Sequence, residues 1–169
     1  MNQKITSSCD CDTCDTNPVF VNPQMGRCPQ SGSQGKRVES TTVKALLAVS
    51  LMELQEVPYY FCRDANCEVV YFSADGSQTF STDALRERVY QKEPARDDVW
   101  VCYCFRYTPA TIRTELVTVN TCTAIHTIET GIAAGRCACD LRNPQGSCCL
   151  GNVRSLIQTL KQSLLDTPR

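Results

Sequence analysis

The sequence predicts an α+β protein in which a small mixed α/β unit is followed by a helical domain. Short aromatic and β-branched runs lie in the first half, and apolar residues at helical spacing dominate the second half. A charged, proline-containing linker, residues 91–98, separates the two halves. Apolar residues make up 42% of the 169 residues, so the chain can form a core and differs from disordered or collagen-like sequences.

The first segment, residues 1–25, is predicted to be a polar arm. Cys9, Cys11 and Cys14 alternate with aspartate and threonine, and two prolines follow. Such a segment offers little apolar surface for packing, so we expect an arm that is either mobile or held only by metal.

Residues 26–98 are predicted to form the mixed α/β unit. Spaced apolar residues predict a helix from about residue 43 to 55, which Pro58 ends. The runs at 59–61 and 69–72 predict two strands joined as a hairpin, whose turn carries a cysteine at each end. We expect a further helix to begin at Thr82.

Residues 99–169 are predicted to form the helical domain. After a short strand at 99–101, Thr108 and Pro109 provide an N-cap and a proline at the first helical position. Further helices are expected at 121–134 and 150–165, where apolar residues again follow helical spacing.

Charge and motif content exclude several function classes. The 17 basic and 18 acidic residues give a net charge of −1 without a basic block, which argues against nucleic acid or anionic lipid as a partner. No run is apolar enough to span a membrane. The single histidine, His126, is interpreted as a packed or capping residue, and no nucleophile motif or phosphate loop is present. These observations leave the question of enzyme activity open and favour an electron-transfer or metal-chaperone protein over a turnover enzyme.

Thirteen cysteines dominate the chemistry of the chain. The first eight residues lack the apolar core of a signal peptide, and the odd count would leave one thiol unpaired in a disulfide scaffold. We therefore expect a cytoplasmic protein whose thiolates bind metal, with a secreted disulfide scaffold as the alternative.

The cysteines of the second half form one predicted metal site. Cys102 and Cys104 are followed about 35 residues later by cysteines at 137, 139, 148 and 149, bunched at expected loop positions. Four thiolates can hold a [2Fe–2S] cluster, two on each iron. The alternative is that these are buried apolar side chains.

Cys28, Cys62 and Cys67 form a second predicted metal site. A cysteine in a turn and two on a hairpin match part of a structural zinc site. The expected fourth ligand position holds Ser31, a poor zinc ligand, so one of the arm cysteines is the natural candidate. Alternatively, the arm binds copper(I) as a soft ion and hands it on, or the hairpin is metal-free.

Several motifs resemble those of a known family. They are residues 60–72 with Cys62-x4-Cys67, Cys102-Tyr103-Cys104-Phe105, Thr108-Pro109-x-x-Ile112-Arg113, and the block from Cys137 to Gly151. They resemble the N-terminal domain of CopZ-type iron–sulfur copper chaperones over roughly residues 26–160. The second half also resembles the bacterioferritin-associated ferredoxin fold, a small helical [2Fe–2S] domain.

The resemblance implies a zinc ion and a [2Fe–2S] cluster. The implied cluster ligands are Cys102, Cys104, Cys139 and Cys149, with Cys148 as the alternative to the last. The implied zinc ligands are Cys28, Cys62 and Cys67, to which we add Cys14 of the arm, with Cys9 or Cys11 as alternatives, because Ser31 departs from the family pattern.

The resulting hypothesis is a metal-handling redox protein that supports copper trafficking. It would reduce Cu(II) to Cu(I) by one-electron transfer and pass the ion on through thiols. The expected partners are a copper chaperone domain or a copper-exporting ATPase, together with a redox partner. The alternatives are a ferredoxin-like electron carrier without a copper role and a zinc-stabilised interaction module.

Overall fold

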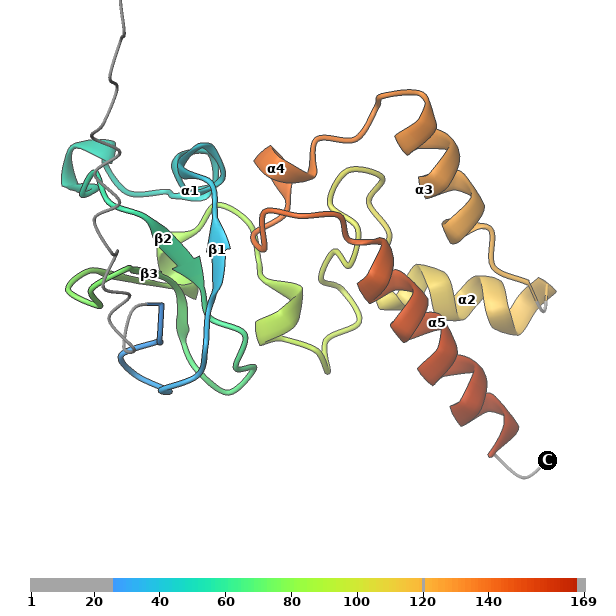
Figure 1. The fold of residues 1–169 in the computed structure, drawn as a ribbon. Coiled ribbons are helices and arrows are strands. Elements are labelled where there is room, and N and C mark those ends of the chain that lie inside the picture. Colours follow the sequence, from blue (N-terminus) through green and yellow to red (C-terminus); the bar gives the residue numbers. More distant parts are fainter. Residues whose placement is uncertain (1–25, 120, 167–169) are drawn as a thin grey trace, which may run out of the picture.

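The computed structural model describes residues 26–119 and 121–166, in which an antiparallel sheet lies beside a group of helices (Figure 1). The predicted arm, with Cys9, Cys11 and Cys14, lies outside these residues. The sheet follows chain order, and its strands are β1 (Lys36–Val38), β2 (Tyr59–Phe61), β3 (Val69–Ser73) and β4 (Thr79–Ser81). The hairpin predicted from the two aromatic runs is confirmed as β2 and β3, with Tyr60 opposite Phe72. The short strands β1 and β4 were not predicted.

The sheet has an apolar core on each face, because side chains of a strand alternate between faces. Tyr59, Phe61 and Tyr71 pack with the helix that covers one face. Phe72 packs with the cysteines of the predicted zinc site on the other face, and Tyr60 stacks on its ring. Every residue of β3 is buried, as expected for a strand that is covered on both sides.

The helix predicted from residue 43 to 55 is shorter and begins earlier. It forms α1 (Ser40–Leu46), after which the chain is extended and Leu47 pairs with Leu85. Full burial of Leu47 in the sheet core outweighs the helical spacing that follows it, and only a 3-10 turn, η1 (Leu51–Glu53), forms there. The helix expected at residue 82 is likewise the 3-10 turn η2 (Thr82–Ala84).

Three helices of the second half agree with the prediction, namely α2 (Pro109–Val119), α3 (Ala124–Ala133) and α5 (Leu150–Leu165). Thr108 caps α2, since its hydroxyl accepts a hydrogen bond from the Thr111 amide. The helices share one apolar core, which includes Ile112, Ile128 and Val153. None of the helices in the described residues is long and apolar enough to cross a membrane.

The segment between the charged linker and α2 differs from the prediction. The expected strand at 99–101 does not form, and the pairing there is an isolated bridge between Cys102 and Tyr107 that closes a tight turn. A 3-10 turn, η3 (Tyr90–Lys92), and a short helix, α4 (Cys139–Arg142), were not predicted. Both elements are too short to leave a periodic sequence signal.

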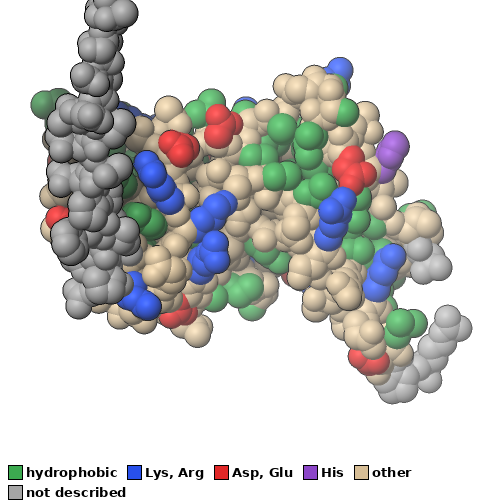
Figure 2. Space-filling view, in the orientation of Figure 1, with side chains coloured by type: hydrophobic (Ala, Val, Ile, Leu, Met, Phe, Trp, Pro, Cys, Tyr) green, Lys and Arg blue, Asp and Glu red, His purple; other side chains and the backbone are tan. Residues whose placement is uncertain are grey.

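The sheet and the helices meet at the loop of residues 143–146. The buried hydroxyl of Tyr71 donates a hydrogen bond of 2.7 Å to the Pro144 carbonyl, and Lys36 donates one of 3.3 Å to the Gln145 carbonyl. Gly146 has a φ of +63° and lies against Val38, so the loop approaches the sheet closely. Figure 1 shows α4 beside α1 at this junction. On the face in Figure 2, basic and acidic side chains are interspersed, in keeping with the small net charge.

Candidate metal centres

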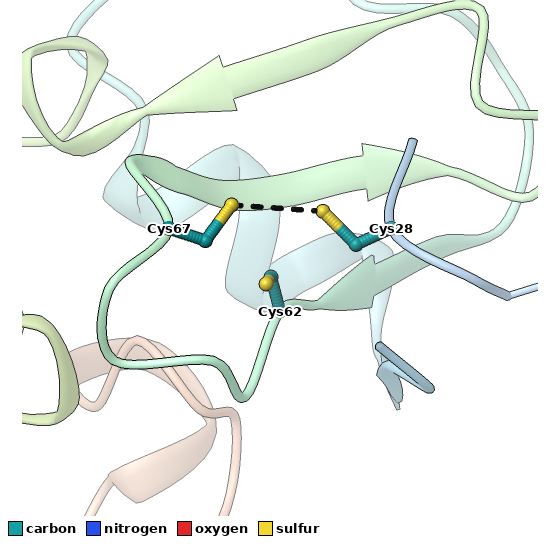
Figure 3. Close-up of side chains that lie close together, drawn as sticks. All are labelled: Cys28, Cys62 and Cys67. Atoms are coloured by element: carbon teal, nitrogen blue, oxygen red, sulfur yellow. Dashed lines mark hydrogen bonds between the residues drawn. The ribbon is translucent and has the colours of Figure 1, made fainter. Parts of the chain in front are cut away.

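Three buried cysteines converge at one end of the sheet (Figure 3). The Sγ atoms of Cys28, Cys62 and Cys67 all lie within 4.8 Å of one another, and those of Cys28 and Cys67 are 3.8 Å apart. These separations suit thiolates that share one tetrahedral ion with Zn–S bonds of about 2.3 Å. Within the described residues, this is the one group of three potential ligands that meet so closely. The donor set therefore fits zinc.

Two tight turns place these cysteines. After Cys28 the chain folds back so that the Gly32 amide donates to the Cys28 carbonyl at 2.8 Å, and Gly32 has a φ of +69°. The turn between Cys62 and Cys67 is closed by Asp64, whose carboxylate accepts a hydrogen bond of 2.9 Å from the Asn66 amide. Both turns are local, which is why the sequence could reveal them.

Three side-chain oxygens lie close to the sulfurs of this site. The Ser31 hydroxyl lies 3.5 Å from the Cys62 sulfur and the Ser33 hydroxyl lies 3.6 Å from it. The amide oxygen of Gln30 lies 3.6 Å from the Cys67 sulfur. Ser31 is therefore at the position that the sequence indicated. The predicted ligand Cys14 lies outside the described residues.

The surroundings of Cys62 favour its thiolate, the form that binds metal. Burial raises its pKa, but hydrogen bonds from Ser31 and Ser33 and the charge of Lys92 bring it down to about 7. Lys92 is held there because its ammonium donates to the Asp64 carbonyl at 2.6 Å. Burial raises the pKa of Cys67. A bound cation would offset that penalty by stabilising the thiolate.

The four cysteines that the family resemblance implied as cluster ligands also lie together. The sulfurs of Cys104 and Cys139 are 3.8 Å apart, and Cys149 interacts with the thiols of both Cys102 and Cys139. These contacts form a chain from Cys102 through Cys149 and Cys139 to Cys104. Such an arrangement suits a dinuclear centre, in which two thiolates bind each iron and need not all meet at one point.

The group has a buried side and a more accessible side. Cys102 and Cys149 are 0% and 1% exposed and belong to the helical core, whereas Cys104 and Cys139 are partly exposed. The Ala138 amide donates to the Cys104 sulfur at 3.3 Å. Phe105 packs against Gly131 of α3, where a side chain would clash with its ring, so α3 supports the loop that carries Cys104.

Hydrogen bonds between the thiols, together with burial, shift the pKa values of this group. Interaction with the Cys149 thiol lowers the pKa of Cys102 to about 7 and that of Cys139 to about 6. The same contacts raise the pKa of Cys149, and burial raises that of Cys104 to about 11. Mutual contact of the thiols is thus the largest cause for Cys102, Cys139 and Cys149, whereas burial is the largest cause for Cys104.

The remaining described cysteines lie outside these two groups. Cys148 is exposed, although it interacts with the thiol of Cys139, and Cys137 is half-buried nearby. Cys122 precedes α3 and contacts Glu115. Of the tandem pair that the sequence left open, Cys149 points into the core and Cys148 toward the surface.

Sequence reasoning missed the residues that support both groups. Ser33 and Lys92 act on Cys62, and Tyr71 holds the loop that leads to Cys149. Ser33 could have been found, since it is two residues beyond the expected ligand position. Lys92 and Tyr71 carry no local signal, because their contacts span 28 and 73 residues.

Comparisons with known proteins relate the chain to a zinc-binding domain family and to a copper chaperone. Residues 25–86 match the zf_CopZ family, described as a zinc-binding domain. The copper chaperone CopZ of Archaeoglobus fulgidus is 34% identical over 132 residues, which cover 78% of this chain and 62% of that protein. The X-ray structure of the N-terminal domain of that CopZ is 31% identical, with a TM-score of 0.63 over 77% of this chain and 96% of the domain. The chain therefore spans less than two thirds of the chaperone's length.

Proposed function

Because the chain belongs to the family of the CopZ N-terminal domain, we propose that it serves copper trafficking with the help of a resident zinc ion and a resident [2Fe–2S] cluster. The comparisons support a zinc-binding domain and a relationship to CopZ. The cluster, the redox step and the individual ligands are our proposal. The observation that carries it is the presence of two separate groups of converging cysteines in one chain.

The zinc ion would be held by Cys28, Cys62 and Cys67, with Cys14 of the arm as the fourth ligand. Tetrahedral zinc takes four donors, and thiolates are far better ligands for it than the nearby serine hydroxyls. The role of this ion would be structural. It would tie the turn at Cys28 to the hairpin of β2 and β3 and so stabilise a small sheet with a modest core.

The cluster would be held by Cys102, Cys104, Cys139 and Cys149. The placement of Cys149 in the core supports it over Cys148 as the fourth ligand. When bound, the cluster would supply the single electron that reduces Cu(II) to Cu(I) after a redox partner has delivered it. The partial exposure of Cys104 and Cys139 would leave one side of the centre within reach of that partner and of copper.

The remaining steps belong to residues of the chain that do not hold the resident metals. We propose that Cys9 and Cys11 of the arm, together with Cys14 when it is not on zinc, accept Cu(I) and pass it on by ligand exchange, since closely spaced thiolates select this soft ion. The recipients would be a copper chaperone domain or a copper-exporting ATPase. This chemistry requires reduced thiols, which fits the cytoplasm.

The two groups of cysteines would belong to separate folding units that meet near residue 98. Support comes from the cores, because Cys62 and Cys67 pack with the sheet whereas Cys102 and Cys149 pack with the helices. The contacts of Tyr71 and Lys36 with the loop of residues 143–146 would couple the units.

The experiment is anaerobic reduction of Cu(II) by the full chain. A chelator that becomes coloured when it binds Cu(I) measures the Cu(I) that forms. Dithionite-reduced protein, freed of excess dithionite, should generate about one Cu(I) per cluster. A Cys104→Ser variant should lose this activity, and the matched Cys122→Ser variant should keep it. A reduced, iron-loaded protein that generates no Cu(I) would overturn the copper role and favour a simple electron carrier.

A further inference from the structure

A cavity of about 370 Å³ lies between the sheet unit and the cysteine-bearing loops of the second half. One wall is formed by the end of α1 and by Arg86 and Glu87, which follow η2. The other wall is formed by Trp100 and Tyr103, and by Arg106 and Arg142, which accompany the loop of Cys104 and the short helix α4. We call this cavity the arginine pocket.

Three arginines and one glutamate line the arginine pocket, and none of the four side chains forms an ion pair with the described part of the chain. Arg86, Arg106 and Arg142 form no ion pair with any carboxylate in residues 26–119 or 121–166, and neither does Glu87. By contrast, Arg88, Arg113 and Arg154 each pair with a carboxylate at the surface. The pocket lining therefore carries a formal charge of about +2, taken as three arginines less one glutamate.

Two of these guanidinium groups are already oriented. Arg86 donates through Nε to the Leu47 carbonyl at 2.8 Å, which leaves its two terminal nitrogens for another acceptor. The guanidinium of Arg106 lies over the ring of Trp100, with 5.6 Å between its carbon and the ring centroid. Groups that are held before binding lose less conformational entropy when a ligand arrives.

Arg106 also occupies a backbone position that normally favours glycine. Its φ is +58°, and among the described residues it is the one non-glycine with a positive φ. The tight turn between Cys102 and Tyr107 requires this left-handed conformation. Glycine would satisfy the turn at lower conformational cost, so the turn itself does not favour arginine at this position.

From these observations we infer that the arginine pocket binds a small oxoanion of the phosphate type. Guanidinium groups present paired N–H donors that match the oxygens of phosphate, and three unpaired ones around a small cavity suit a dianion better than a single carboxylate. The volume lies within the usual range for small-molecule sites and would hold a phosphate group together with a small attached moiety.

Binding would also affect the proposed cluster, and this consequence rests on the proposed function. Tyr103 lies between Cys102 and Cys104, and Arg142 is three residues beyond Cys139, so the pocket adjoins both loops of the cluster site. A dianion there would disfavour the additional negative charge of the reduced cluster. Phosphate should therefore lower the reduction potential.

The test is a titration of the full, metal-loaded chain with inorganic phosphate at constant ionic strength. Trp100 is the only tryptophan, so its fluorescence reports on the pocket directly. We expect saturable binding that an Arg142→Gln variant weakens about tenfold, the effect of losing one charge-assisted contact. Arg136→Gln is the matched control, since Arg136 is an exposed arginine beside Cys137 that does not line the pocket, and it should bind as the unmodified chain does.

An Arg106→Gly variant separates binding from folding. Glycine suits the positive φ, so thermal stability should be retained while phosphate binding is weakened. A titration without saturation, or equal binding by all variants, would overturn the inference. So would a glutamate-rich peptide that saturates the pocket where phosphate does not, because the site would then be a docking point for an acidic protein. The fluorescence readout requires no copper. If the chain binds phosphate but does not reduce Cu(II), the proposed function is contradicted and the phosphate site is not.

Discussion

The loop that leads to Cys149 is attached to the sheet by the buried hydroxyl of Tyr71 as well as by Lys36, and replacing Tyr71 by phenylalanine tests the first of these contacts. The hydroxyl donates a hydrogen bond of 2.7 Å to the Pro144 carbonyl, and both residues are buried. Phenylalanine keeps the ring in the sheet core but leaves the carbonyl without a partner or access to water. Such an unsatisfied group costs about 1–3 kcal/mol.

A loss of about 2 kcal/mol would lower the midpoint of urea unfolding by about 1 M at a slope of about 2 kcal/mol per molar. Hydrogen exchange gives a local readout, because the Gly146 amide, which donates to the Asn143 carbonyl at 2.8 Å, should exchange faster once the loop is released. Tyr60→Phe is the matched control, since its hydroxyl forms no hydrogen bond with the described part of the chain. Equal midpoints for Tyr71→Phe and Tyr60→Phe would refute the reasoning.

The remaining predictions concern the cysteine groups. Cys62→Ser should lower zinc affinity at least about 100-fold and reduce the melting temperature, while Cys122→Ser should change neither; metal analysis and calorimetry decide this. Ser31→Cys should raise zinc affinity about tenfold, because its side chain lies 3.5 Å from the Cys62 sulfur, and an unchanged competition with a zinc indicator would contradict this. Ser155→Cys, an exposed added thiol on α5, is its control. Cys104→Ser should remove visible absorbance but leave zinc content near one per chain, and joint loss of both metals would argue against separate centres.

Local sequence signals predicted the features that are built locally. The hairpin of β2 and β3 and the capped start of α2 were predicted because strand alternation, turn residues and an N-cap are read over a few neighbouring positions. Cys62 and Cys67 were paired for the same reason. Cys28 is 39 residues away from Cys67 in the sequence. Its assignment to the same site rests on the ligand requirements of zinc and not on a local sequence pattern.

Tertiary packing determines the features that local sequence signals do not predict. Residues 47–55 have helical spacing, but Leu47 is buried in the sheet core and pairs with Leu85, so the helix ends before it. The short strands β1 and β4 exist because neighbours pair with them. The attachment of the loop of residues 143–146 to Tyr71 and Lys36 depends on the relative position of the two halves.

The central claim is that the two groups of cysteines bind different metals, and it can be measured on the anaerobically purified full chain. Zinc and iron analysis should give about one zinc and two irons per chain, with broad absorption between roughly 400 and 600 nm that bleaches with dithionite. A colourless protein that takes up zinc but never iron and sulfide would contradict the cluster at Cys102, Cys104, Cys139 and Cys149, and would leave a zinc-stabilised domain.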